Sequence, residues 1–168
     1  MNAVIVIGLG NPLMSDEGVG IRVVQALSSR AAMFPGVDFA DLGTAGMRVL
    51  HAIAGRRQAI FVDCAFMGQP PGSVRRFTPD AVRSLKFLPG LSLHEGDLLE
   101  TLDLSRRLGE APEEIVIFGI EPLSITPGME LSAPVAARLD DCVAQVAREL
   151  RCCDQPASPA PAAGQRSC

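Results

Sequence analysis

Short apolar runs alternate with longer amphipathic stretches along this chain, and the alternation predicts repeated strand–helix–strand units. The first run, residues 4–9 (VIVIGL), is apolar without interruption, which is typical of a parallel strand that is covered on both faces. Similar runs predict strands at residues 37–42, 59–63 and 115–120. Because parallel strands are joined by long crossovers, usually helices, the pattern indicates an α/β fold.

Between these strands, apolar residues recur every three or four positions, as they do on one face of a helix. The spacing predicts helices that begin at residue 17, at residue 47 and at residue 94, the last running to about residue 108. A final helix is expected over residues 133–150. Its apolar stripe consists of Val135, Leu139, Val143, Val146 and Leu150.

A turn and a short strand are expected after the third strand. Residues 69–72 (QPPG) have the composition of a turn, and residues 73–77 are suited to pair back as an antiparallel edge strand. Residues 79–85 are long enough only for a short helix. We therefore expect a three-layer α/β/α sandwich with a mostly parallel, twisted sheet of about five strands and one antiparallel edge strand.

Length and composition predict one folded domain and a tail. A chain of 168 residues that is 48% hydrophobic can bury a sizeable core, and we place a single α/β domain at residues 1–152. Residues 153–168 are rich in proline and alanine and hold almost no large apolar side chain. Such a segment cannot offset the entropy of ordering, so we expect a disordered tail.

Charge and cysteine content exclude several classes of partner. The net charge of -4 and the absence of a basic run longer than two residues argue against nucleic-acid binding. The first apolar run is too short to span a membrane and lacks a basic leader, so we expect a cytoplasmic protein without membrane association. The five cysteines lack paired zinc-type spacing and are expected to be reduced thiols.

Candidate chemistry lies where the predicted strands end. Glu17 follows the first strand, Asp63 ends the third strand, and His94 opens a later helix. The carboxyl ends of parallel strands form a crevice in which ligands bind. Two carboxylates and an imidazole suit borderline divalent ions such as nickel, zinc, manganese or iron(II), and differ from the thiolate-rich ligands of structural zinc. The sequence therefore predicts a divalent-metal site.

Each of these residues also has a structural interpretation. Glu17 would stabilise the positive end of a helix dipole, although Ser15 or Asp16 is better placed to cap that helix. Asp63 would accept backbone amides from the next loop, since an unpaired buried carboxylate is costly. His94 would cap the helix that it opens, or pack against neighbouring side chains. The residues alone leave these alternatives open.

Two other motifs are interpreted as structural. Gly8 and Gly10 follow a strand as in a dinucleotide-binding turn, but no third glycine stands at the required position. Cys64 lies next to Asp63, and neighbouring strand residues point to opposite faces, so we expect it to pack in the core. His51 lies in an ordinary helical stripe and is expected to be structural or solvated.

Several segments together resemble one enzyme family. The segments are residues 8–20 (GLGNPLMSDEGVG), 41–47 (DLGTAGM), 63–65 (DCA), 92–95 (SLHE), 119–122 (GIEP) and 131–132 (LS). In order and spacing they resemble the motifs of the [NiFe]-hydrogenase maturation endopeptidases, and the resemblance covers nearly all of residues 3–150.

The resemblance implies an endopeptidase that removes a C-terminal extension from the precursor of the hydrogenase large subunit after nickel insertion. Glu17, Asp63 and His94 match the metal-binding positions of the family. On this view nickel is supplied by the substrate, although other divalent metals fit the same site, and cleavage would proceed only on a loaded precursor.

The second matching segment implies contacts with the substrate peptide. Asp41 matches a family position and is expected to assist proton transfer near the scissile bond. Gly43, Thr44 and Gly46 are expected to hold the extended C-terminal peptide. Family members commonly have a second glycine where this chain has Leu42, and substrate choice would shift there.

Two other functions remain alternatives. A non-enzymatic nickel-binding maturation module would use the same three ligands without a peptide cleft. A peptidyl-tRNA-hydrolase-like esterase shares the Gly-Leu-Gly-Asn-Pro turn, but this chain has no histidine between Asn11 and His51 to supply a base. Its acidic balance also gives no electrostatic attraction for tRNA.

Overall fold

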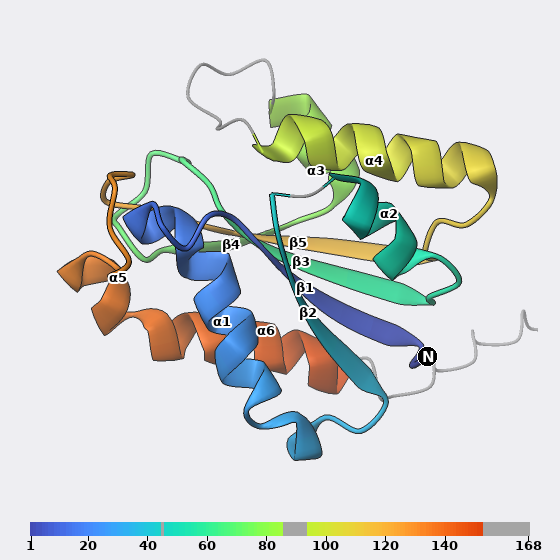
Figure 1. The fold of residues 1–168 in the computed structure, drawn as a ribbon, viewed down its shortest axis with the longest axis horizontal. Helices are drawn as coiled ribbons and strands as arrows, with labels where there is room; N and C mark the ends of the chain where they lie inside the picture. Colours follow the sequence, from blue (N-terminus) through green and yellow to red (C-terminus); the bar gives the residue numbers. More distant parts are fainter. Residues whose placement is uncertain (45, 86–93, 153–168) are drawn as a thin grey trace, which may run out of the picture.

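A computed structural model describes residues 1–44, 46–85 and 94–152 (Figure 1). Within these residues, five strands form one sheet in the order β2-β1-β3-β5-β4. The strands are β1 (Val4–Leu9), β2 (Val37–Gly43), β3 (Gln58–Cys64), β4 (Val74–Phe77) and β5 (Glu114–Ile120). All neighbours pair in parallel except β4, which runs antiparallel to β5 at the edge. The predicted sheet, including its antiparallel edge strand, is confirmed.

Helices cover both faces of the sheet and complete the predicted three layers (Figure 1). One face carries α1 (Val19–Ser28), α5 (Ala133–Ala137) and α6 (Leu139–Cys152), and the other carries α2 (Gly46–Ile53), α3 (Pro79–Leu85) and α4 (His94–Leu108). Two 3-10 turns, η1 (Ser15–Gly18) and η2 (Ala31–Met33), flank α1. None of the helices in the described part of the chain combines the length and apolar character needed to span a bilayer.

The strands send alternate side chains into two separate cores. In β3, Ile60 and Val62 pack with α1 and α6, whereas Phe61 packs with α2 and α4. Cys64 continues the first set and is buried in the α1/α6 core. Because side chains alternate along a strand, Asp63 shares the face of Phe61. The two neighbours at the end of β3 therefore point into different layers.

The last predicted helix is broken. Instead of one helix over residues 133–150, α5 ends at Ala137 and α6 begins at Leu139, with Arg138 between them at φ -106° and ψ 3°. The turn at Gly72 packs against the Arg138 side chain here, where a Cβ on Gly72 would lie 2.9 Å from it. The predicted apolar stripe still faces the core on both sides of the break.

The first connection lies directly on the sheet because glycines remove the side chains between them. A Cβ on Gly20 would lie 2.2 Å from the carbonyl oxygen of Val62 in β3 and 2.7 Å from that of Leu9 in β1. A Cβ on Gly10, which has a φ of +117°, would lie 1.9 Å from the carbonyl oxygen of Glu17. Backbone therefore packs on backbone here, which only glycine permits.

Asp16 fastens this connection to a segment more than 100 residues away. Its side chain is fully buried and accepts hydrogen bonds from the backbone N–H groups of Leu123 (2.9 Å), Ser124 (3.3 Å) and Ser132 (2.7 Å), and from the Ser132 hydroxyl (2.7 Å). The expectation that Asp16 caps the following helix is wrong, because these distant donors occupy its oxygens.

The pKa of Asp16 reflects two opposing effects. Burial raises this pKa, but the hydrogen bonds from Ser132, Leu123 and Ser124 together outweigh burial and hold the pKa below its usual value. Asp16 is therefore a charged, buried anchor between η1 and the connection from β5 to α5.

Replacing Asp16 by Asn is expected to lower the free energy of unfolding at pH 7 by about 2–4 kcal/mol, because an amide loses the charge-assisted bonds and turns a donor toward N–H groups. A carboxylate whose folded pKa is depressed stabilises the protein above its unfolded pKa of about 3.9. This contribution is lost as the pH falls through the folded pKa. Urea unfolding at a series of pH values should show the gap between the two proteins narrowing below about pH 4. Asp140→Asn, at an exposed position of α6, is the control, and a pH-independent gap would contradict the assignment.

Replacing Gly20 by Ala is expected to lower the free energy of unfolding by at least about 2 kcal/mol, because the added methyl group meets two backbone carbonyls that cannot move aside. Gly46→Ala is the matched control. Both glycines lie in helices, and a Cβ on Gly46 would meet only the Thr101 hydroxyl, at 3.3 Å. Denaturant unfolding of both variants measures the difference, and equal stabilities would refute the close-approach argument.

Candidate functional site

The topology marks one point on the sheet where a site is expected. From β1 the chain crosses to β2 on one side and then returns to β3 on the other side of β1. In open α/β sheets, ligands bind outside the carboxyl ends of the strands at such a switch point. Glu17 lies in the connection that follows β1, and Asp63 lies next to the end of β3. Both residues therefore border this crevice.

The carboxylates of Asp63 and Glu17 differ in how much of each is exposed to solvent and in the contacts of each. Asp63 is buried, with 2% of its surface exposed, and its Oδ1 accepts a hydrogen bond from the backbone N–H of Cys64 at 2.8 Å. Glu17 is half-buried in η1, which packs against β3. Asp63 thus has a backbone contact within β3, while Glu17 is partly exposed to solvent.

The pKa of the Cys64 thiol depends on burial and on the carboxylates near the end of β3. Burial raises its pKa, and the nearby carboxylates of Asp63, Glu17, Asp16 and Glu121 raise it further. The thiol therefore stays protonated at neutral pH and packs in the α1/α6 core, as expected from the sequence. Each of these four carboxylates therefore lies near enough to the Cys64 thiol to raise its pKa.

Glu121 is a buried residue of the site region to which the sequence analysis assigned no role. It follows β5, is 5% exposed, and its Oε2 accepts hydrogen bonds from the backbone N–H groups of Met67 (2.6 Å) and Gln69 (3.1 Å). These bonds shape the connection that leaves β3. Its place directly after a buried strand is the signal that selected Asp63 and that applies equally to Glu121.

Asp41 lies at the same edge of the sheet but apart from the carboxylate pair. It is exposed and pairs in register with Gly8 of β1. Because β1 lies between β2 and β3, the strands that carry Asp41 and Asp63 are about 10 Å apart. The Oδ1 of Asp41 accepts the backbone N–H of Gly43 at 3.3 Å, which places its carboxylate beside the turn that follows.

The predicted peptide-binding residues begin at that turn. Gly43 has a φ of +60°, which favours glycine, and its carbonyl oxygen accepts the N–H of Gly10 at 3.1 Å. Thr44 is exposed. Gly46 opens α2 and, with Met47, Glu100, Thr101 and Leu104, lines a cavity of about 290 Å³ between α2 and α4.

His94 is the first residue of α4, and this helix begins at the end of the sheet where β3 finishes (Figure 1). The side chain of His94 lies outside the described part of the structure, as do Ser92 and residues 153–168. Among the side chains that are described, no three His, Cys, Asp or Glu residues are grouped so that they could hold a metal ion. The ligand set of Glu17, Asp63 and His94 stays a prediction.

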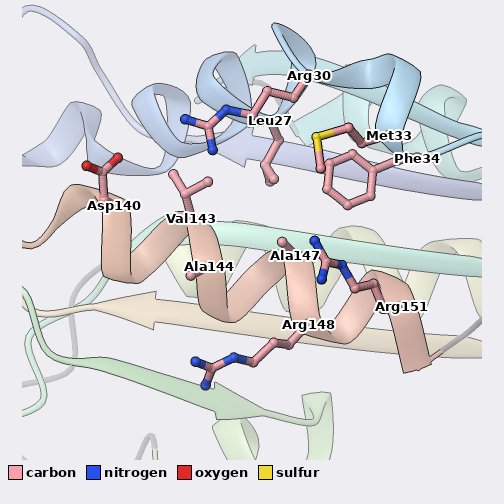
Figure 2. Close-up of a pocket in the computed structure, with 10 residues that line it drawn as sticks. All are labelled: Leu27, Arg30, Met33, Phe34, Asp140, Val143, Ala144, Ala147, Arg148 and Arg151. Carbon is pink, nitrogen blue, oxygen red and sulfur yellow. The ribbon is translucent and has the colours of Figure 1, made fainter.

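A second cavity is separate from these residues. It has a volume of about 430 Å³ and lies between the end of α1, η2 and α6. Figure 2 shows apolar side chains such as Leu27, Phe34 and Val143 facing the space between the helices, with Arg30 and Arg151 extending toward it. Its lining includes none of the predicted site residues.

Sequence comparisons identify relatives across most of the chain. The sequence model of the hydrogenase maturation protease family HycI matches residues 21–149. The hydrogenase 2 maturation protease of Escherichia coli K12 is 33% identical over 149 residues, which cover 88% of this chain and 90% of that protein. The hydrogenase expression/formation protein HoxM of Cupriavidus necator is 31% identical over 149 residues, with 88% of this chain and 74% of that protein covered.

Solved structures agree with the sequence relatives. The hydrogenase maturating endopeptidase HybD from E. coli has a TM-score of 0.79 at 31% identity, covering 92% of this chain and 94% of HybD. The maturation protease HybD from Thermococcus kodakarensis has a TM-score of 0.72 at 27% identity, covering 89% and 99%. Matched over most of its length in both sequence and fold, the chain belongs to the hydrogenase maturation proteases and is an endopeptidase of hydrogenase maturation.

Proposed function

We propose that this endopeptidase removes a C-terminal extension from the precursor of a [NiFe]-hydrogenase large subunit after nickel has been inserted. The observation that carries the proposal is the convergence of Glu17 and Asp63 on the switch point of the sheet, at the end where α4 begins with His94. Nickel is part of the substrate in this proposal, and these three residues contact it in the loaded precursor.

The donor chemistry supports a nickel ligand. Carboxylate oxygens and an imidazole nitrogen suit borderline divalent ions, whereas the one thiol at the end of β3, Cys64, is buried on the other face and protonated. The two carboxylates that lie at the same end of the sheet, Glu17 and Asp63, also favour a cation there. Glu17, being half-buried, can reach a metal carried by a partner protein.

Hydrolysis requires that water adds to the scissile carbonyl carbon and that the released amine receives a proton. We assign proton transfer to Asp41, which is exposed at the same edge of the sheet. Its hydrogen bond from Gly43 holds it beside the peptide-binding turn. Gly43, Thr44 and Gly46 hold the extended peptide, and the cavity between α2 and α4 that adjoins Gly46 gives it room.

The experiment that tests this function compares nickel-loaded and nickel-free precursor. Intact-mass measurement before and after incubation should show loss of a C-terminal peptide from the loaded precursor only, because the site contacts nickel carried by the substrate. Equal cleavage of both samples would contradict the nickel requirement. Cleavage of neither sample, with a verified cognate precursor, would contradict the peptidase function proposed for this substrate and favour a non-enzymatic nickel-binding module.

Replacing His94 by Ala is expected to slow processing at least about 100-fold, the scale at which loss of one electrostatic contact in an active site lowers rates. His51→Ala is the matched control, because the chain has two histidines and His51 is exposed on α2. The rate of extension loss and the thermal unfolding temperature are measured for both variants. Full processing by a folded His94→Ala protein would rule out the metal-contact assignment.

A further inference from the structure

Besides Met47, which is 61% exposed and lines the cavity between α2 and α4, three large apolar side chains stand exposed around the candidate site. Leu13, in the turn after β1, is 60% exposed, while Leu123 and Met129, between β5 and α5, are 54% and 62% exposed. Leu13 precedes Glu17 by four residues, and Leu123 follows Glu121 by two. We call these three side chains the mouth rim. They come from connections that lie at the same end of the sheet, at the left of Figure 1.

The two connections that carry the mouth rim are bonded to each other along their backbones. The N–H of Gly128 donates to the carbonyl oxygen of Leu13 at 2.9 Å, and the N–H of Ser15 donates to the carbonyl oxygen of Gly128 at 2.8 Å. The Ser15 hydroxyl donates to the carbonyl oxygen of Glu130 at 3.0 Å. Leu13 and Met129 therefore stand on paired segments.

Charged side chains hold the remaining parts of the same segments. Arg22 of α1 donates to the carbonyl oxygen of Met129 at 2.8 Å, and buried Asp16 accepts the N–H of Leu123 at 2.9 Å. Leu123 and Met129 thus each have a backbone group bonded to a side chain of residues 16–22, and the carbonyl oxygen of Leu13 is bonded to Gly128. The connections cannot collapse to bury their apolar side chains without breaking these bonds.

The backbone also holds an unfavourable conformation at this place. Ser15 has a φ of +51° and is the one non-glycine residue with a positive φ in the described chain. Such a conformation costs about 1 kcal/mol or more for a residue with a side chain. The hydrogen bonds from its N–H and hydroxyl keep it there, so the shape of the mouth rim is maintained against a local preference.

Exposed apolar side chains that are scattered singly need no explanation, whereas a group on one surface marks an interaction site. Met33 in η2 and Leu108 at the end of α4 are exposed by 61% and 56%, but η2 precedes β2 and the end of α4 precedes β5, so both lie toward the amino end of the strands and away from the candidate site. The mouth rim differs because its members share bonded segments beside the candidate site. The cavities of about 430 Å³ and 290 Å³ are lined by other residues. The mouth rim is therefore not part of either cavity, and we expect it to contact the surface of another protein.

We propose that Leu13, Leu123 and Met129 bind an apolar patch on the folded body of the hydrogenase large-subunit precursor, beside its C-terminal segment. This inference rests on the proposed function. The mouth rim is a positioning surface, which brings the scissile bond to the crevice between Glu17 and Asp63. The occupant is the substrate protein because the rim is continuous with the site on which that protein must act.

The test is a pair of matched double variants, L123S/M129S and L108S/M33S. The members of the pairs have the same residue types and nearly equal exposures, 54% and 62% against 56% and 61%. With nickel-loaded precursor, the rim variant should lose at least about tenfold in kcat/KM through a higher KM at unchanged kcat, as removal of uniform binding requires. The control variant should keep the wild-type values. Adding L13S to the rim variant should raise KM further.

Other results would overturn the inference. Equal KM values for the rim and control variants, with an active wild-type enzyme, would refute the mouth rim and leave the proposed function intact. If the wild-type enzyme cleaves no precursor, sedimentation of the enzyme with the precursor still compares binding by both variants, and equal binding would refute the rim. Dissociation of a wild-type dimer in the rim variant alone, with unchanged KM, would assign the rim to a second copy of the chain.

Discussion

The site depends on direct backbone-to-backbone contact in the connection between β1 and α1. Gly10 and Gly20 remove the methyl groups that would separate η1 and α1 from the ends of β1 and β3. The position of Glu17 relative to Asp63 follows from this contact, since no side chain can adjust the spacing. Asp16 then bonds the same segment to the connection from β5 to α5. One short stretch of sequence thus packs on the ends of β1 and β3 and is bonded to the connection from β5 to α5.

Asp16 and Glu17 show how neighbouring carboxylates take different roles. Asp16 is fully buried, and hydrogen bonds compensate for its lost hydration, so its charge serves the fold. Glu17 lies in the connection that borders the crevice and is half-buried. Burial raises the pKa of the Cys64 thiol, and the two carboxylates together with Asp63 and Glu121 raise it further. Asp16 and Glu121 accept hydrogen bonds from backbone N–H groups and serve the fold. Glu17 and Asp63 are therefore the two carboxylates of the proposed metal contact.

Local patterns in the sequence predicted the strands, most helices and the edge at which Glu17 and Asp63 lie, because apolar periodicity and strand ends are local properties. The partners of Asp16 are separated from it by 107 to 116 residues, so no local pattern distinguishes an anchor from a helix cap. The break at Arg138 also depends on a distant turn, at Gly72. Glu121 could have been selected by the rule that selected Asp63. The metal-binding role of His94 was predicted from its donor chemistry, its place at the start of a helix and the family resemblance, and it stays a prediction.

The hydrogen bonds that hold the connections also bear on how a protein substrate is selected. A surface that is ordered before binding loses little conformational entropy when a partner docks, so more of the apolar contact contributes to affinity. Accurate placement of a reacting bond contributes strongly to rate. If the proposed docking surface and the proposed nickel contact both operate, cleavage would require two independent features of the substrate, its folded surface and its metal. Under that proposal an unfolded precursor would lack the first feature and an unloaded precursor would lack the second.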